Sequence, residues 1–189
     1  CVLGMTGEAV TIREDELAVI ERAFQAGFVQ PNPPARRTGK SVAVVGSGPA
    51  GLSCAAQVNQ AGHSVVVFER DDRLGGLLRY GIPDFKLEKW VIDRRLALWQ
   101  AEGIEFVTGG HVGRDFPTAK LLKDFDAVCV AGGCRAPRDL PVPGRELRGI
   151  HFALEYLIQA NRRVANDPPA QEALIDARGK QVVVLGGGD

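Results

Sequence analysis

A glycine-rich turn between two apolar segments is the strongest chemical signal in the sequence. Gly46-Ser47-Gly48-Pro49-Ala50-Gly51 follows the apolar run Val42–Val45 and opens a segment, residues 50–61, whose small apolar residues predict a helix. In this spacing Gly46 permits a tight turn, Gly48 lets the main chain approach a pyrophosphate, and Gly51 lets helix and strand pack closely. Pro49 suits a first helical turn, and the unpaired N–H groups there attract phosphate. The turn therefore predicts a dinucleotide site.

Glu69 provides the carboxylate that a dinucleotide site needs at the end of its second strand. Val65–Phe68 repeats the apolar strand pattern and is followed by Glu69, at roughly the 20-residue spacing of the dinucleotide fingerprint. An acid there can accept hydrogen bonds from both hydroxyls of an adenosine ribose, and it disfavours a 2′-phosphate. A glycine turn with a purely structural role is the alternative. Nucleotide binding is favoured because the glycine turn comes together with a strand, a helix, a second strand and a terminal acid at the expected spacing.

Two further glycine pairs favour FAD over NAD. Gly75-Gly76-Leu77-Leu78 comes shortly after Glu69 and resembles the element that flavoproteins with two dinucleotide-binding domains place beside the ribityl chain and pyrophosphate. A simple type II turn is the alternative. Residues 127–133, which end in Gly132-Gly133, resemble the strand before the Ala-Thr-Gly loop of the same class, with Gly132 where threonine is usual.

The elements that must position these residues alternate between strands and helices. Thr11-Ile12-Arg13-Glu14 has the spacing of a capping box and predicts a helix over residues 12–26, and an extended connector follows over residues 30–40. Beyond the first βαβ unit, the patterns predict helices over residues 86–101 and 151–165 and strands over residues 104–107, 126–131 and 181–185. This alternation predicts a doubly wound α/β fold.

Composition and charge exclude several classes of protein. The 189 residues include 23 lysines and arginines against 23 aspartates and glutamates, so the formal net charge is zero, and 45% of the residues are hydrophobic. A neutral globular chain without long runs of like charge is not expected to bind nucleic acid or an anionic membrane. The longest apolar run, Ala127–Ala131, is far shorter than the ~20 residues that span a bilayer, so no transmembrane helix is expected.

The cysteines and the first residues favour the cytoplasm. Neither a disulfide framework nor a paired zinc pattern is formed by Cys1, Cys54, Cys129 and Cys134. No charged segment followed by a long apolar one suggests export. Cys129 is expected to be a small core residue. The three histidines lie away from any acid or cysteine at ligand spacing, so no catalytic residue is assigned.

Longer stretches of the sequence resemble one family of flavoproteins. The stretches are Cys1-Val2-Leu3-Gly4, Val10-Thr11-Ile12, residues 44–52 and residues 75–87. Together they resemble the small (beta) subunits of bacterial NADPH-dependent glutamate synthases, over essentially the whole chain. The electron-input module of dihydropyrimidine dehydrogenase and ferredoxin-linked NADPH oxidoreductases share much of the pattern, and such a module stays as an alternative function.

The resemblance implies a function and a set of contacts. In that family the subunit takes a hydride from NADPH onto FAD and passes electrons through [4Fe-4S] clusters to a large subunit that makes glutamate. The implied FAD contacts are Gly48, Pro49, Ala50, Glu69, Arg70, Gly76, Leu77, Lys86 and Val112. Lys86 would place a cation near the reduced flavin, the alternative being an exposed lysine at a helix start. Cys1 would be the last ligand of a cluster whose other cysteines lie upstream, so we expect it to be unoccupied in this chain.

The resemblance also divides the chain. Residues 1–39 would be a helical segment and linker at the end of an iron–sulfur domain, residues 40–178 an incomplete Rossmann-like FAD-binding domain, and residues 179–189 the start of an NADPH-binding domain. The sequence thus reads as a piece of a longer protein. This piece is expected to be inactive alone and to bind FAD, whereas NADPH and [4Fe-4S] would bind only in the full-length protein. A catalytically silent nucleotide-binding module that serves assembly with the large subunit stays as a second hypothesis.

Overall fold

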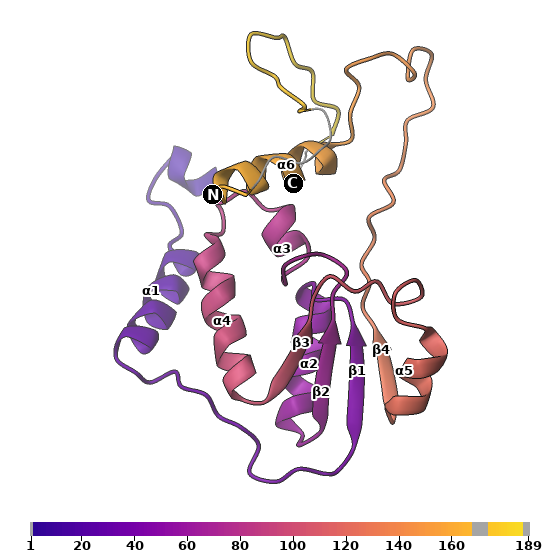
Figure 1. The fold of residues 1–189 in the computed structure, drawn as a ribbon. Helices are drawn as coiled ribbons and strands as arrows, with labels where there is room; N and C mark the ends of the chain where they lie inside the picture. The colour runs from indigo at the N-terminus through magenta and orange to yellow at the C-terminus, as the bar shows by residue number, and fades with distance from the viewer. Residues whose placement is uncertain (1, 168–173, 187–189) are drawn as a thin grey trace.

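The fold is built on a parallel four-stranded sheet. The computed structural model describes residues 2–167 and 174–186, and its strands follow the order β3-β2-β1-β4 (Figure 1). The strands are β1 (Ser41–Val45), β2 (Ser64–Phe68), β3 (Ile104–Val107) and β4 (Ala127–Val130). Both neighbours of the central strand β1 run parallel to it, with Val44 beside Val67 and Cys129. This order confirms the predicted doubly wound α/β fold.

The helices lie before, between and after the strands. They are a 3₁₀ turn at Val2–Met5, α1 (Ile12–Gln25), α2 (Pro49–Gln60), α3 (Leu77–Tyr80), α4 (Lys89–Ala101), α5 (Thr118–Asp124) and α6 (Ala153–Val164). After β4 the chain leaves the sheet in a long extended segment and then reaches α6 (Figure 1). Within the described ranges, no helix combines the length and the apolar character needed to cross a membrane.

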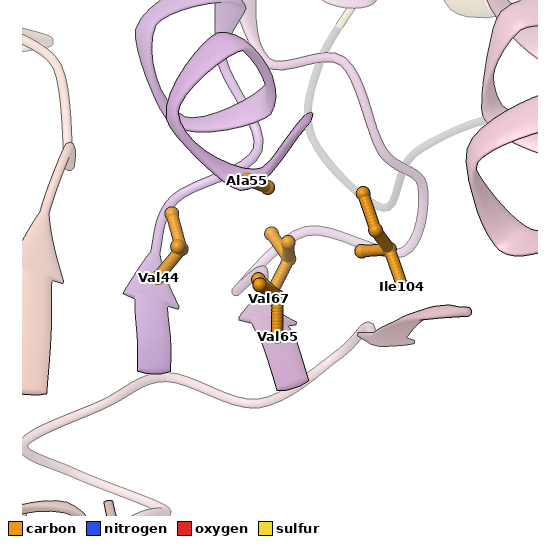
Figure 2. Packing of buried hydrophobic residues seen from close by; sticks show 5 residues of the cluster. All are labelled: Val44, Ala55, Val65, Val67 and Ile104. Atoms are coloured by element: carbon orange, nitrogen blue, oxygen red, sulfur yellow. The ribbon is translucent and has the colours of Figure 1, made fainter. Parts of the chain in front are cut away.

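Both faces of the sheet are covered, which explains the uninterrupted apolar strands. On one face Val44, Val65, Val67 and Ile104 pack against Ala55 of α2 (Figure 2). On the other face Ala43 and Phe68 pack with Leu121 of α5. Neighbouring residues of a strand point to opposite faces, so a strand buried on both sides needs apolar side chains at every position. The hydrophobic runs that the sequence shows are the consequence.

Most predicted elements form within two or three residues of their expected ends, and the differences have local causes. The helix expected from residue 86 begins at Lys89, because the carbonyl of Pro83 accepts the N–H groups of Lys86 and Leu87 and closes a separate turn. Lys86 is therefore an exposed turn residue and not a helix start. The predicted capping box is also wrong, since the Thr11 hydroxyl donates to the Asp15 carboxylate at 3.3 Å and makes no cap hydrogen bond.

The strand predicted over residues 181–185 is not formed. Residues 181–186 carry no strand, and the side chains of Val183 and Leu185 are 84% and 78% exposed. A strand needs a neighbour for its backbone N–H and C=O groups, and the described part of the chain offers none to this run. Apolar composition alone was therefore insufficient to predict it.

The connector at residues 30–40 is extended, as predicted, and it is fastened to the domain. One nitrogen of the Arg37 guanidinium donates to Asn59 Oδ1 at 2.7 Å and to the His63 carbonyl at 2.8 Å, and the other donates to the Glu102 carbonyl at 3.0 Å. Asn59 is fully buried and donates to the same Glu102 carbonyl at 3.2 Å. The connector is thus bound to the C-terminal ends of α2 and α4.

A second fastening holds α1 to α4. The Arg94 guanidinium donates to both carboxylate oxygens of Glu21, at 2.8 and 2.6 Å, and lies 3.7 Å from the centre of the Phe24 ring. A bidentate pair with an aromatic partner fixes the direction of a guanidinium better than a single contact does. The N-terminal helix therefore has a defined place beside α4.

Polar contacts attach α6 to the α3 region. The Asp72 carboxylate accepts hydrogen bonds from Arg162 at 2.7 Å and from the Tyr80 hydroxyl at 2.6 Å. Asn161, which is buried, donates to the Tyr80 carbonyl at 3.0 Å. These contacts hold α6 against α3 at the end of the extended segment.

This attachment predicts a pH dependence of stability. Partial burial raises the pKa of Asp72, but the hydrogen bonds from Arg162 and Tyr80 outweigh it and lower the pKa to about 2. A lowered pKa stabilises the fold above the unfolded value of ~3.9, and the contribution is lost as the pH falls toward 2. We expect Asp72→Asn to cost about 1 kcal/mol at pH 7, because half of this side chain is solvent-exposed. In urea unfolding the gap between the wild type and the variant should close between pH 4 and pH 2, and a pH-independent gap would contradict the assignment.

Candidate functional site

Two glycines of the turn between β1 and α2 are required by the fold. Gly46 has φ +106°, and a Cβ atom there would lie 2.4 Å from the Ala131 carbonyl oxygen. A Cβ atom at Gly51 would lie 1.9 Å from the Gly46 carbonyl oxygen. Neither position has room for a side chain. The predicted roles of a tight turn at Gly46 and of close helix–strand packing at Gly51 agree with this geometry.

Gly48 is different from its two neighbours in the motif. Its φ is −65°, which any residue can adopt, and a Cβ atom there would meet no heavy atom within 4 Å. It is the N-cap residue of α2, with Pro49 in the first turn. The fold does not need glycine at this position, yet the absence of a side chain leaves open space at the helix N-terminus. That space suits a phosphate, which unpaired N–H groups and the helix dipole attract.

Glu69 lies beside this turn, at the end of β2. Only 4% of it is exposed, and one carboxylate oxygen accepts hydrogen bonds from the Ser47 N–H at 2.9 Å and the Ser47 hydroxyl at 2.5 Å. The other oxygen accepts from the Asp71 N–H at 3.0 Å. A carboxylate has about four acceptor positions, so protein donors fill three and one remains for a ligand hydroxyl. This is fewer than the two ribose contacts that the sequence suggested.

The second glycine pair, Gly75-Gly76, packs against the turn between β1 and α2. Gly75 and Gly76 have φ +117° and +52°, and a Cβ atom at Gly76 would lie 3.0 Å from the Cα atom of Gly48. A simple type II turn needs only one positive φ, so this pair is a more specialised element, and α3 follows it directly. The backbone of the pair is thereby held against the turn at Gly48.

A cavity of about 360 Å³ gathers nearly all of the predicted site residues. The predicted residues that line it are Gly46, Gly48, Pro49, Ala50, Glu69, Arg70, Gly76, Leu77, Val112, Gly132 and Gly133. Two of the predicted cofactor-binding residues lie outside it. Gly51 is buried in the packing of α2 against the turn, and Lys86 is exposed in the turn before α4. The cavity lies beyond the C-terminal ends of the strands, where ligands bind in open α/β sheets.

Arg135, which lines the cavity, forms an ion pair with Asp71 that no sequence pattern predicted. Arg135 donates to both carboxylate oxygens of Asp71, one of them at 3.2 Å. Hydrogen bonding to Asp71 raises the pKa of the Arg135 guanidinium. Because Asp71 also donates its N–H to Glu69, the pair ties the loop after β4 to the carboxylate. Sixty-four positions separate the two residues, and no local pattern could have paired them.

The cysteines are divided between the core and the cavity. Cys129 is half-buried and packs with Cys54 against the core beneath α2, in agreement with its predicted role. Burial raises the pKa of the Cys54 thiol. Cys134 is exposed and lines the cavity. Cys1, the predicted cluster ligand, lies outside the described residues, and the histidines, cysteines and acids inside them form no group that could hold a metal ion.

Comparison with known proteins decides the family. Residues 40–189 match the family described as pyridine nucleotide-disulphide oxidoreductase. The chain belongs to this family. The matched region begins just before β1 and includes the glycine turn, Glu69 and the whole lining of the cavity.

The chain is also similar, over its whole length, to proteins of known name. The chain is 56% identical over its whole length to "Glutamate synthase [NADPH] small chain" of Mycobacterium tuberculosis H37Rv and 49% identical to that of Bacillus subtilis. It spans 39% and 38% of the length of these two relatives. The resemblance to glutamate synthase small chains that the sequence motifs indicate is confirmed.

Solved structures support the same fold. Mycobacterium tuberculosis FprA in complex with NADPH superposes with a TM-score of 0.59 at 25% identity, over 65% of this chain and 29% of FprA. A 2-naphthoyl-CoA reductase superposes with a TM-score of 0.52 at 27% identity, over 67% of this chain and 19% of the reductase. The Rossmann-like α/β fold expected from the sequence is therefore shared with known oxidoreductases.

Proposed function

We propose that the cavity holds FAD and that the chain is the flavin-binding part of a glutamate synthase small subunit, an oxidoreductase that accepts a hydride from NADPH. The observation that carries the proposal is the open space at Gly48. Two neighbouring glycines are required by the fold, whereas this one only keeps the N-terminus of α2 free. A glycine without a folding role at a helix start is explained by a phosphate that must approach the backbone.

Each side of the cavity has a part in holding the nucleotide. The turn at Gly48, Pro49 and Ala50 receives the pyrophosphate, and the remaining acceptor position of Glu69 receives an adenosine ribose hydroxyl. Gly76 keeps the opposite wall close to the phosphates. The other predicted contacts also line the cavity: Arg70, Leu77, Val112, Gly132 and Gly133. Bound FAD supplies the hydride acceptor, which none of the protein side chains can replace.

Partners and further cofactors are proposed from the relatives. Because the chain is similar to proteins named as small chains, we assign it a large glutamate synthase subunit as partner. Electrons would reach that subunit through [4Fe-4S] clusters, with Cys1 as one cluster ligand in the longer protein. The NADPH complex of FprA supports NADPH as the hydride donor, with its domain starting at residues 179–189. The cytoplasm stays the predicted location.

The flavin itself provides the direct test. The purified protein should show flavin absorbance, and dithionite should bleach it. A silent assembly module, which was the second hypothesis, would bind ADP without any reducible chromophore. A protein that binds neither FAD nor ADP would overturn the proposed function, while one that binds only ADP would favour the assembly module.

Replacing Glu69 by alanine should weaken FAD binding by about 1–3 kcal/mol, roughly 5- to 150-fold, because a ribose hydroxyl loses a charged acceptor in a buried site. Flavin titration followed by fluorescence measures the change. Glu105→Ala is the matched control, since Glu105 is an exposed acid on the neighbouring strand β3 and does not line the cavity. An unchanged dissociation constant for Glu69→Ala would mean that the acid has been misassigned.

A further inference from the structure

Ser47 is a fully buried polar residue whose side chain the proposed function does not use. It stands between Gly46 and Gly48, and the motif leaves its type open. Its hydroxyl is bonded on two sides, to Glu69 Oε2 at 2.5 Å and to the Gly75 N–H at 3.0 Å. One small side chain thus connects the phosphate turn, the ribose acid and the second glycine pair.

The direction of these hydrogen bonds follows from the chemistry of the groups. The backbone N–H of Gly75 can only donate, so the Ser47 oxygen is its acceptor. The single hydroxyl hydrogen of Ser47 is then left to point at the carboxylate of Glu69. The bonds run one way, from Gly75 through Ser47 to Glu69, and in a buried chain each strengthens the next.

Glu69 depends on this series of hydrogen bonds for its orientation. The second donor on the same oxygen is the Ser47 backbone N–H, and the Asp71 N–H occupies the other oxygen. With all three donors in place, the carboxylate keeps its remaining acceptor position in one direction. Without the hydroxyl, Glu69 loses one donor and the buried Gly75 N–H loses the side-chain acceptor that the Ser47 hydroxyl provides.

We propose that Ser47 is a positioning residue, which orients Glu69 toward the nucleotide ribose and locks the Gly75–Gly76 pair against the phosphate turn. The inference rests on the proposed function and deepens it. It assigns the recognition of a ribose hydroxyl to a pair, Ser47 and Glu69, and not to the acid alone. An alanine at this position would preserve the turn and lose the recognition.

The test compares ADP with 2′,3′-dideoxy-ADP by isothermal titration calorimetry on the purified protein after its bound flavin has been removed. We expect the wild type to bind ADP at least tenfold more tightly, and Ser47→Ala to reduce that preference to about twofold. Binding of the dideoxy nucleotide should change by less than threefold, because it has no ribose hydroxyl for Glu69 to bind. A merely structural role would weaken both nucleotides equally and leave their ratio unchanged.

Two variants separate positioning from stability. Ser47→Thr keeps the hydroxyl and should keep the preference for ADP, and Ser53→Ala removes an exposed hydroxyl of α2 and should change nothing. Full preference in Ser47→Ala would overturn the role of Ser47 and leave the proposed function standing. A wild type that binds ADP without preference would overturn the ribose contact, and one that binds no nucleotide would overturn the proposed function itself.

Discussion

Replacing Gly48 by valine should abolish flavin binding, with the dissociation constant for FAD rising at least 100-fold, while the protein stays folded. The backbone at Gly48 has an extended conformation that valine adopts readily, and the space around its missing Cβ atom is open. The valine methyl groups would fill the place where phosphate oxygens accept hydrogen bonds from the start of α2. The loss corresponds to about 2.7 kcal/mol of binding free energy or more.

Flavin titration and urea unfolding together check this prediction. The unfolding free energy of Gly48→Val should lie within about 1 kcal/mol of the wild type, since only the N-cap preference changes. Gly48→Ala is the graded control, because it adds a single methyl group and should weaken binding less. A Gly48→Val protein that copurifies with stoichiometric flavin would show that the pyrophosphate lies elsewhere.

The opposite outcome is expected at Gly51, where alanine should lower the free energy of unfolding by about 2–3 kcal/mol. The new methyl group would lie 1.9 Å from the Gly46 carbonyl oxygen, so the first turn of α2 must move away from the sheet. Alanine is favoured over glycine in a helix by about 1 kcal/mol, which opposes the steric cost and is smaller. Urea unfolding followed by circular dichroism measures the difference.

Gly48→Ala again serves as the control, because it makes the same chemical change three positions earlier without a clash. Its unfolding free energy should stay close to that of the wild type. Equal stability of Gly51→Ala and the wild type would refute the close packing of α2 on the turn.

The first βαβ unit could be predicted from the sequence because local rules and tertiary packing agree there. Val42–Val45 and Val65–Phe68 are apolar at every position, and both are central strands covered on two faces. Gly62, with φ +94°, follows α2 directly after the helix predicted over residues 50–61. The roles of Gly46 and Gly51 also follow from spacing, since each is a property of one short turn.

Predictions failed where the outcome depended on distant partners. Val182–Leu185 has the composition of a strand but no neighbouring strand to pair with in the described structure. Lys86 stands before a helix-like pattern, yet the carbonyl of Pro83 starts its own turn. The short helices α3 and α5 contain too few turns to show a period.

Within the site, sequence reasoning found the carboxylate and missed the groups that hold it. Glu69 follows a strand at a known distance from the glycines, which is a local pattern. Ser47 lies inside the same motif, but its contacts with Glu69 and Gly75 span 22 and 28 positions. The partner of Asp71 comes from the loop after β4. Such contacts are set by the assembled sheet and leave no periodic trace in the sequence.

Arg37 fastens the connector to one end of α2. It donates to Asn59 in the last turn of this 12-residue helix and to the carbonyl of His63 just after it, and the other end of the helix adjoins the glycine turn. A helix of this length is a stiff rod of about 18 Å. The connector and the glycine turn therefore contact opposite ends of one rigid element, so the N-terminal segment and the candidate site share α2 as a common support.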